Sequence, residues 1–181
     1  MKMITAYVAT GIAFALIDSV WLRSMYARLY QLELGRLLLD LLPGDAALEG
    51  LLALMLLHHA RRASRVGPNG SIVPLAEQDR SLWDSGLIAE GIALAQEALA
   101  RDELGEYQAQ AAIAALHADA RSADETDWVQ IVEWYDELVR LTESPVVRLN
   151  RAVAVGEAES AQAGLIALAE LDSSPVSYTH L

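Results

Sequence analysis

Histidines are the residues of this sequence with the widest chemical range, and their spacing decides what they can do together. His58 and His59 are adjacent. Adjacent side chains of a helix point about 100° apart, whereas a helical zinc site needs two histidines at i, i+4 with a glutamate between them. His117 and Asp119 are also out of phase on a helix. The histidines therefore predict a polar helix end and a capping role, and the sequence predicts no metal site.

Paired carboxylates are the second class of residue that could do chemistry. Glu133 and Glu137 have i, i+4 spacing, as do Asp136 and Arg140. The second pair predicts a surface ion pair worth about 0.3 kcal/mol. A carboxylate pair does acid–base work only in a pocket that shifts a pKa, and the sequence contains neither a phosphate-binding loop nor a nucleophile elbow. We therefore predict no catalytic residue, no cofactor and no enzymatic activity.

Two groups of polar residues are candidates for binding a partner. The first surrounds a tryptophan and has side chains at i, i+4 spacing, which share one helical face: Asp79, Arg80, Trp83 and Asp84. This group predicts either a helix cap with an ion pair or part of a concave binding surface. The second group lies within alanine-rich helices: Gln110, Asn150 and Arg151. Polar groups at such positions bond to the neighbouring helix or to a peptide ligand.

Helices must position these residues, because alanine and leucine dominate the sequence and apolar residues recur at helical spacing. The pattern predicts an all-α fold with helices over 22–42, 45–65, 79–99, 106–119, 127–142, 145–156 and 159–171. Asp45 and Ser144 are predicted N-caps, and either Asp79 or Ser81 is predicted to start the third helix. The Gly-Pro-Asn-Gly sequence at 67–70 predicts a short hairpin or loop near 65–75.

Two predicted helix pairs resemble each other. Trp83 opens one helix and residues 110–114 fill the next, while Trp128 opens a later helix and residues 150–154 fill the one after it. A large aromatic residue facing small alanines lets paired helices pack closely, as in tetratricopeptide-like repeats, where each pair buries its apolar face on its neighbour. A generic helical bundle with tryptophans in its core is the alternative.

Charge and composition exclude several functions. The net charge is −12, and a surface this acidic repels phosphate backbones. We therefore predict no direct nucleic-acid binding. The chain has no cysteine, which excludes disulfides and thiolate metal sites.

The apolar stretch over residues 3–22 is about long enough to span a bilayer. Trp21 and Tyr26 suit a membrane interface, and the basic residues beyond Trp21 place the following chain in the cytoplasm. Two predictions stay open: an inner-membrane anchor that carries a cytoplasmic domain, or the buried first helix of a soluble domain. Residues 1–30, with Ala6-Tyr7 and Trp21-Leu22, also resemble the first helix of a family of small bacterial membrane proteins. That resemblance implies a chimeric segment.

Residues 34–172 carry a second resemblance, in motifs that keep their order along the chain. The motifs are Leu34-Gly35-Arg36-Leu37-Leu38, Gly50-Leu51-Leu52-Ala53-Leu54, Asp79-Arg80-Ser81-Leu82-Trp83-Asp84, Tyr107-Gln108-Ala109-Gln110-Ala111, Thr126-Asp127-Trp128 and Leu149-Asn150-Arg151-Ala152-Val153. They resemble the tetratricopeptide-like C-terminal extension of bacterial extracytoplasmic-function RNA polymerase sigma factors.

This resemblance implies a regulatory protein–protein interaction module in the bacterial cytoplasm, which tunes transcription initiation. Its implied partners are the sigma domains and, through them, RNA polymerase. Full-length members of that family carry DNA- and polymerase-binding domains ahead of the extension, and residues 1–33 contain no promoter-reading motif. We therefore predict three parts: an apolar helix over 1–30, a helical repeat domain over 31–172, and a tail over 173–181. From Pro175 onward the tail resembles a translated sequencing adapter.

Overall fold

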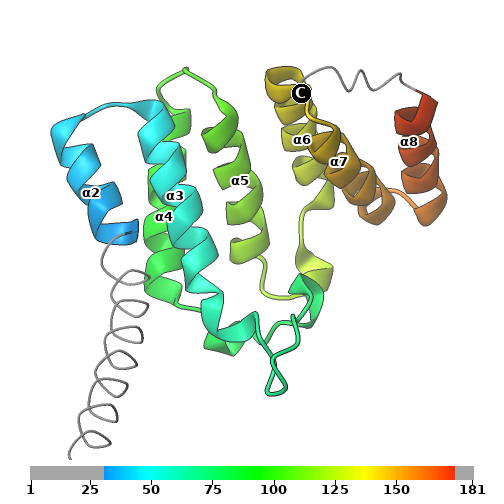
Figure 1. Ribbon diagram of the computed structural model, residues 1–181, viewed down its shortest axis with the longest axis horizontal. Coiled ribbons are helices and arrows are strands. Elements are labelled where there is room, and N and C mark those ends of the chain that lie inside the picture. The colour runs from blue at the N-terminus through cyan, green and yellow to red at the C-terminus, as the bar shows by residue number, and fades with distance from the viewer. Residues whose placement is uncertain (1–30, 174–181) are drawn as a thin grey trace, which may run out of the picture. The chain divides into compact units, whose positions relative to one another are not determined.

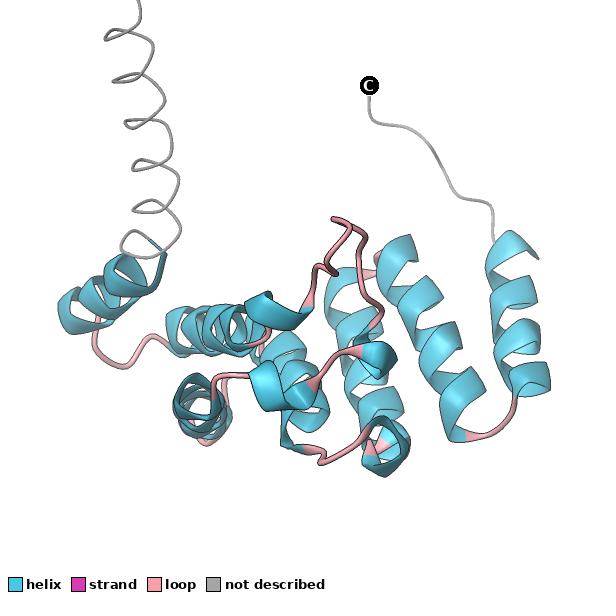
Figure 2. Ribbon diagram, turned by 90° about the horizontal axis from the view of Figure 1, so that it is seen from below, coloured by secondary structure: helices cyan, strands magenta, loops and turns pink. Residues whose placement is uncertain are grey.

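The computed structural model describes residues 31–173, which contain seven α-helices and four short 3-10 helices (Figure 1). The α-helices are α2 (Gln31–Leu41), α3 (Ala46–Ala60), α4 (Ser85–Leu99), α5 (Glu106–Asp119), α6 (Trp128–Thr142), α7 (Pro145–Ala158) and α8 (Ala161–Ser173). The 3-10 helices are η2 (Arg62–Ser64), η3 (Leu75–Glu77), η4 (Arg80–Leu82) and η5 (Ala123–Glu125). Helices and loops account for this whole part of the chain, as Figure 2 shows. The predicted all-α fold is confirmed.

The chain divides into two compact units at the boundary between Pro43 and Gly44. Helix α2 lies in the first unit, and helices α3 to α8 form the second. The predicted anchor over 3–22, the predicted chimeric segment over 1–30 and all of the predicted tail except Ser173 lie outside the described residues. Within residues 31–173, no helix combines the length and the apolar composition that crossing a membrane requires.

Aspartate caps fix where several helices begin. The carboxylate of Asp45 accepts a hydrogen bond of 3.0 Å from the Leu48 amide at the start of α3, and that of Asp127 accepts one of 3.0 Å from the Gln130 amide at the start of α6. These bonds satisfy amides that have no partner within the helix. The predicted Asp45 cap is confirmed. Ser144 does occupy the predicted N-cap position of α7, with Pro145 in the first turn, but its side chain makes no capping hydrogen bond.

The helix predicted from Asp79 or Ser81 instead begins at Ser85. Asp79 accepts a 2.9 Å hydrogen bond from the Ser81 amide and so caps the 3-10 turn η4. Trp83 then has extended backbone, with φ −79° and ψ 140°, and Asp84 caps α4 by accepting from the amide two residues ahead at 3.0 Å. Trp83 therefore opens no helix, which corrects the predicted repeat, whereas Trp128 does open α6.

The predicted feature near 65–75 is a small hairpin. Val66 and Ile72 form an isolated antiparallel bridge, and Gly70 turns the chain with a φ of +76°. A side chain at that φ would strain the backbone, so glycine suits the turn. The helix predicted over 45–65 is shorter than expected, because α3 ends at Ala60 and η2 follows it.

Helices α3 to α8 pack mainly against their neighbours in sequence, and α3 also contacts α5 (Figure 1). The core contains fully buried leucines of α3 and residues of α6: Leu52, Leu56, Leu57, Ile131 and Leu138. Two glycines allow close approach. A Cβ at Gly50 would lie 2.8 Å from the backbone nitrogen of Gln108, and one at Gly91 would lie 2.8 Å from Cγ of Leu57. Contact between successive helices is the packing expected of a helical repeat.

Candidate binding groove

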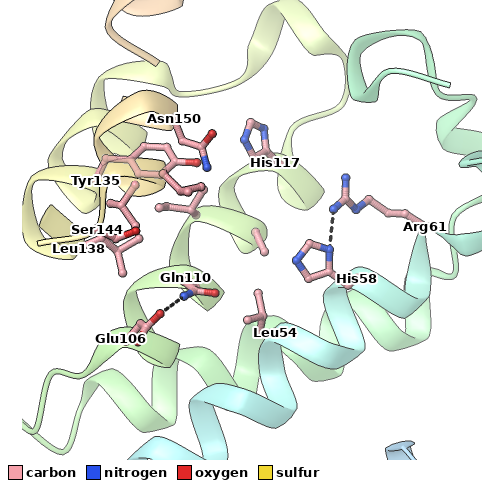
Figure 3. Close-up of a pocket in the computed structure, with 14 residues that line it drawn as sticks. Leu54, His58, Arg61, Glu106, Gln110, His117, Tyr135, Leu138, Ser144 and Asn150 are labelled. Atoms are coloured by element: carbon pink, nitrogen blue, oxygen red, sulfur yellow. Dashed lines mark hydrogen bonds between the residues drawn. The ribbon is translucent and has the colours of Figure 1, made fainter. Parts of the chain in front are cut away.

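An open groove of about 470 Å³ lies between four helices of the second unit. Figure 3 shows the side chains that surround it. Helix α3 contributes Leu54 and His58, Arg61 follows at its C-cap, and α5 contributes Glu106, Gln110, Ile113, Ala114 and His117. Tyr135 and Leu138 come from α6, Ser144 precedes α7, and Val146, Val147 and Asn150 come from α7. We call this surface the groove.

Two of the residues predicted to bind a partner, Gln110 and Asn150, line the groove from different helices. The Gln110 amide donates a 2.8 Å hydrogen bond to the Glu106 carboxylate, which is one helical turn away (Figure 3). Tyr135 lies on the same side of the groove as Asn150, and burial raises the pKa of its phenol. The groove therefore combines amide and hydroxyl groups with apolar side chains.

The third residue of that group, Arg151, does not line the groove. Its Nε donates a 2.5 Å hydrogen bond to Oδ1 of Asp136 and so joins α7 to α6. Asp136 was predicted to pair with Arg140, but Arg140 pairs with Glu137 instead. Arg151 is thus an interhelical contact rather than a ligand-facing group.

The residues around Trp83 hold the loops against the helices. Arg80 donates to the carbonyl oxygens of His117 at 2.9 Å and Ala120 at 2.7 Å, at the end of α5. Asp79 and Asp84 are both caps, so the ion pair predicted between Arg80 and Asp84 does not form. None of these three lines the groove.

Trp83 is buried and supports the cations at one end of the groove. Its indole N–H donates a 2.8 Å hydrogen bond to the Ser64 hydroxyl. The guanidinium carbon of Arg80 lies 4.4 Å from its ring centroid and that of Arg61 lies 5.8 Å from it, both within range of a cation–π contact. Trp83 therefore acts beneath the groove and not on its surface.

Five basic side chains gather around this end of the groove, and we call them the cationic cluster: His58, Arg61, Arg65, Arg80 and His117. Arg61 donates to Nδ1 of His58 at 3.1 Å, and Arg65 donates to the same nitrogen at 2.9 Å. Because a guanidinium can only donate, Nδ1 of His58 must accept in both contacts.

The cluster keeps its histidines neutral at pH 7. Burial, followed by the charges of Arg61 and Arg65, lowers the pKa of His58 to about 4. Burial, followed by Arg61 and Arg80, lowers the pKa of His117 to about 4 as well. Arg61 itself is only 8% exposed. Burial and the two neighbouring arginines lower its pKa to about 10, so it stays charged at neutral pH.

This chemistry favours recognition over acid–base catalysis. A general base works best with a pKa near the working pH, and imidazoles with a pKa of about 4 take up protons poorly at pH 7. Within residues 31–173, no group of three histidine, aspartate or glutamate side chains is arranged to hold a metal ion. The groove can instead offer N–H donors, amide groups and apolar contacts to a bound molecule.

Sequence reasoning missed three residues of the groove: His58, Arg61 and His117. His58 was treated as a helix end and His117 as a cap, because each was compared only with its near neighbours in sequence. The available signal was the run of basic residues from 58 to 65 in an acidic chain. That run indicates an unusual local charge, but it does not predict that α5 packs beside it.

Comparison with known proteins relates this chain to a protein family and to a longer bacterial protein. Residues 23–99 match the model of a family of unknown function, DUF6596. The chain is 48% identical over 134 residues to an uncharacterized protein of Rhizobium meliloti (strain 1021), an alignment that covers 74% of the chain and 32% of that relative. The chain thus spans about a third of the length of this curated relative. No solved structure matches the chain.

Proposed function

We propose that this chain is a regulatory protein–protein interaction module of an extracytoplasmic-function sigma factor, and that it binds the sigma domains through the groove. The observation that carries this proposal is the groove itself. Four helices converge there, and amide side chains of α5 and α7 face apolar residues of α3 and α5. Concave surfaces of helical repeats commonly bind extended segments of partner proteins.

The ordered motifs over residues 34–172 support the choice of partner. In the family that they resemble, an extension of this kind accompanies sigma domains in a longer protein. The Rhizobium relative is about three times as long as the matched region, which leaves room for such domains. In this proposal RNA polymerase is reached through the sigma domains, and the net charge of −12 argues against direct contact with DNA.

Calorimetric titration of the full chain tests the proposal, with the two DNA- and polymerase-binding domains of a sigma factor, called sigma domains two and four, produced separately. We expect a dissociation constant in the micromolar range or tighter. Gln110→Ala and Asn150→Ala should each weaken binding by about tenfold, which corresponds to about 1.4 kcal/mol. Gln162→Ala on the exposed surface of α8 is the matched control and should bind normally. No association at micromolar concentration would reject the proposal.

A sigma-factor partner implies a cytoplasmic location, with or without an anchor at residues 3–22. Expression of the full chain followed by carbonate extraction of the membranes separates these alternatives. Release into the supernatant is expected for an unanchored module. Retention in the membrane pellet would instead support the anchor.

A further inference from the structure

Arg61 is a buried charge that lacks an opposite charge in the described part of the chain. Its side chain is 8% exposed, and His58 is the side chain to which it donates a hydrogen bond. The neighbours that shift its pKa, Arg65 and Arg80, carry the same sign of charge. Buried ions in proteins are normally paired or bound to a ligand, because removing a charge from water is costly.

Three other arginines of the described residues do have carboxylate partners. Arg101 bonds to Glu49, Arg140 to Glu137 and Arg151 to Asp136. The chain also has 25 acidic residues against 13 basic ones, so carboxylates are plentiful. The charge of Glu125 acts to raise the pKa of Arg80, whereas the charges that shift the pKa of Arg61 are those of Arg65 and Arg80. The absence of a carboxylate at Arg61 is therefore a property of this site and not of the composition.

Arg61 lies where a bound ligand can supply the negative charge that the described residues do not. Arg61 lines the groove at its cationic end, where Figure 3 shows its guanidinium joined to His58. Both histidines are neutral at pH 7, so neither adds to the charge of the site. The guanidinium has five N–H donors in a planar fork that matches a carboxylate. Donors not used by His58 remain for a group that enters the groove.

The rest of the groove suits a peptide better than a small inorganic anion. Gln110 and Asn150 carry both donor and acceptor groups, which can pair with the backbone of an extended peptide. Leu54, Ile113 and Val147 supply apolar contacts for neighbouring side chains. A free phosphate would use the guanidinium alone and leave these other groups without a role.

We propose that Arg61 anchors an acidic peptide segment of the partner, by taking one aspartate or glutamate carboxylate at the cationic end of the groove. This inference rests on the proposed function, because it names the feature that the groove recognises in the sigma domains. Gln110 of α5 and Asn150 of α7 then form hydrogen bonds with the peptide backbone beside that carboxylate. The net charge of −12 opposes acidic ligands elsewhere on the chain, so the cluster localises their binding.

Peptide binding to the full chain tests this inference. The probes are overlapping peptides from sigma domains two and four, acetylated and amidated so that only side chains carry carboxylates. Binding is followed by fluorescence anisotropy. We expect the bound peptides to contain an aspartate or glutamate whose replacement by the matching amide weakens binding by tenfold or more. Arg61→Met should bind the acidic and amide peptides equally, and Arg61→Lys should keep part of the preference.

Two controls separate recognition from folding. Arg140→Met removes an exposed arginine of α6 that pairs with Glu137, and it should keep the wild-type preference. Arg61→Gln provides a second, polar replacement, and the circular dichroism of each variant confirms folding. Inorganic phosphate at millimolar concentration should not displace the peptides; displacement would show a simple anion site and overturn the inference.

The outcomes also distinguish this inference from the proposed function. If the whole sigma domains bind but no peptide shows the acidic preference, or if Arg61→Met leaves that preference unchanged, the inference is wrong and the function stands. If neither the domains nor the peptides bind, both are wrong.

Discussion

A charged side chain is buried at each end of helix α3, but among the described residues only one of the two has a partner of opposite charge. At the first turn, Glu49 is 6% exposed and accepts two hydrogen bonds from Arg101, at 2.7 and 2.5 Å. Just after the last turn, at the C-cap, Arg61 bonds to neutral His58 and lies near two further arginines. The first charge is neutralised within the protein and ties α3 to the segment that follows α4. The second lacks such a partner and faces the groove. The difference teaches that the two ends of one helix can hold a buried charge in opposite ways, paired with a carboxylate at one end and without one, beside an open groove, at the other.

The comparison requires α3 to be held rigidly between its ends. Leu57 is fully buried, and Leu57→Ala should lower the free energy of unfolding by about 2–5 kcal/mol because it leaves a cavity. Leu165→Ala, at a position of α8 that is 60% exposed, should change it by less than about 0.5 kcal/mol. Urea unfolding measures both. Equal effects would mean that α3 is not the core of the unit.

The first end of α3 also depends on close contact with α5. Gly50→Ala should lower the free energy of unfolding by about 1–3 kcal/mol, since the new Cβ would lie 2.8 Å from the backbone of Gln108. Gly156→Ala on α7 is the matched control, because its nearest atom lies at 3.7 Å. The free energy of unfolding of that variant should rise by about 0.5–1 kcal/mol, because alanine has a better helix propensity than glycine. Stabilisation by both substitutions would contradict the close contact.

The second end of α3 should make stability depend on pH. Because the folded-state pKa values of His58 and His117 are about 4, below the ordinary 6.5, the unfolded chain binds more protons between these values. The contribution of these two histidines to the free energy of unfolding is therefore fully present above pH 6.5, and it is lost as the pH falls toward 4. From pH 7 to 5 we expect a loss of about 1–2 kcal/mol from His117, and less from the more exposed His58, which solvent screens.

Thermal unfolding at several pH values measures this loss. His117→Gln should flatten the dependence between pH 7 and 5, while His59→Gln, which lies outside the groove, serves as the matched control. An unchanged slope in His117→Gln would show that this imidazole is not held neutral by the cluster.

The smallest expected effect compares the two charges directly. Arg61→Met should raise the free energy of unfolding by about 1 kcal/mol, because it removes a buried charge that has no carboxylate partner. Arg101→Met should lower it, because Glu49 is then left buried without its partner. Urea unfolding of the two variants side by side gives the result. A larger decrease in the free energy of unfolding for Arg61→Met than for Arg101→Met would contradict the view that only Glu49 has its charge partner within the described part of the protein.

Local sequence features predicted the elements of this structure well. Helix α5 matches its predicted range, and the aspartate at 45 and the proline at 145 mark true helix starts. The errors have local causes too. Asp79 and Asp84 are both good caps, and only the extended backbone of Trp83 decides that α4 begins after the second one.

The groove could be predicted only in part. Gln110 and Asn150 were found because polar residues are unusual on alanine-rich helices. Arg61 and His117 were not, because their meeting depends on the crossing of α3 and α5. That crossing follows from Gly50, where the absence of a side chain lets the helices approach, and no periodicity encodes it.

Hydrogen–deuterium exchange of the full chain with and without sigma domains two and four tests the central claim most directly, because it locates the contact. The account predicts slower exchange over residues 54–61, 110–117 and 146–150, with α8 unchanged. Slower exchange confined to α8, or no change anywhere, would contradict binding through the groove.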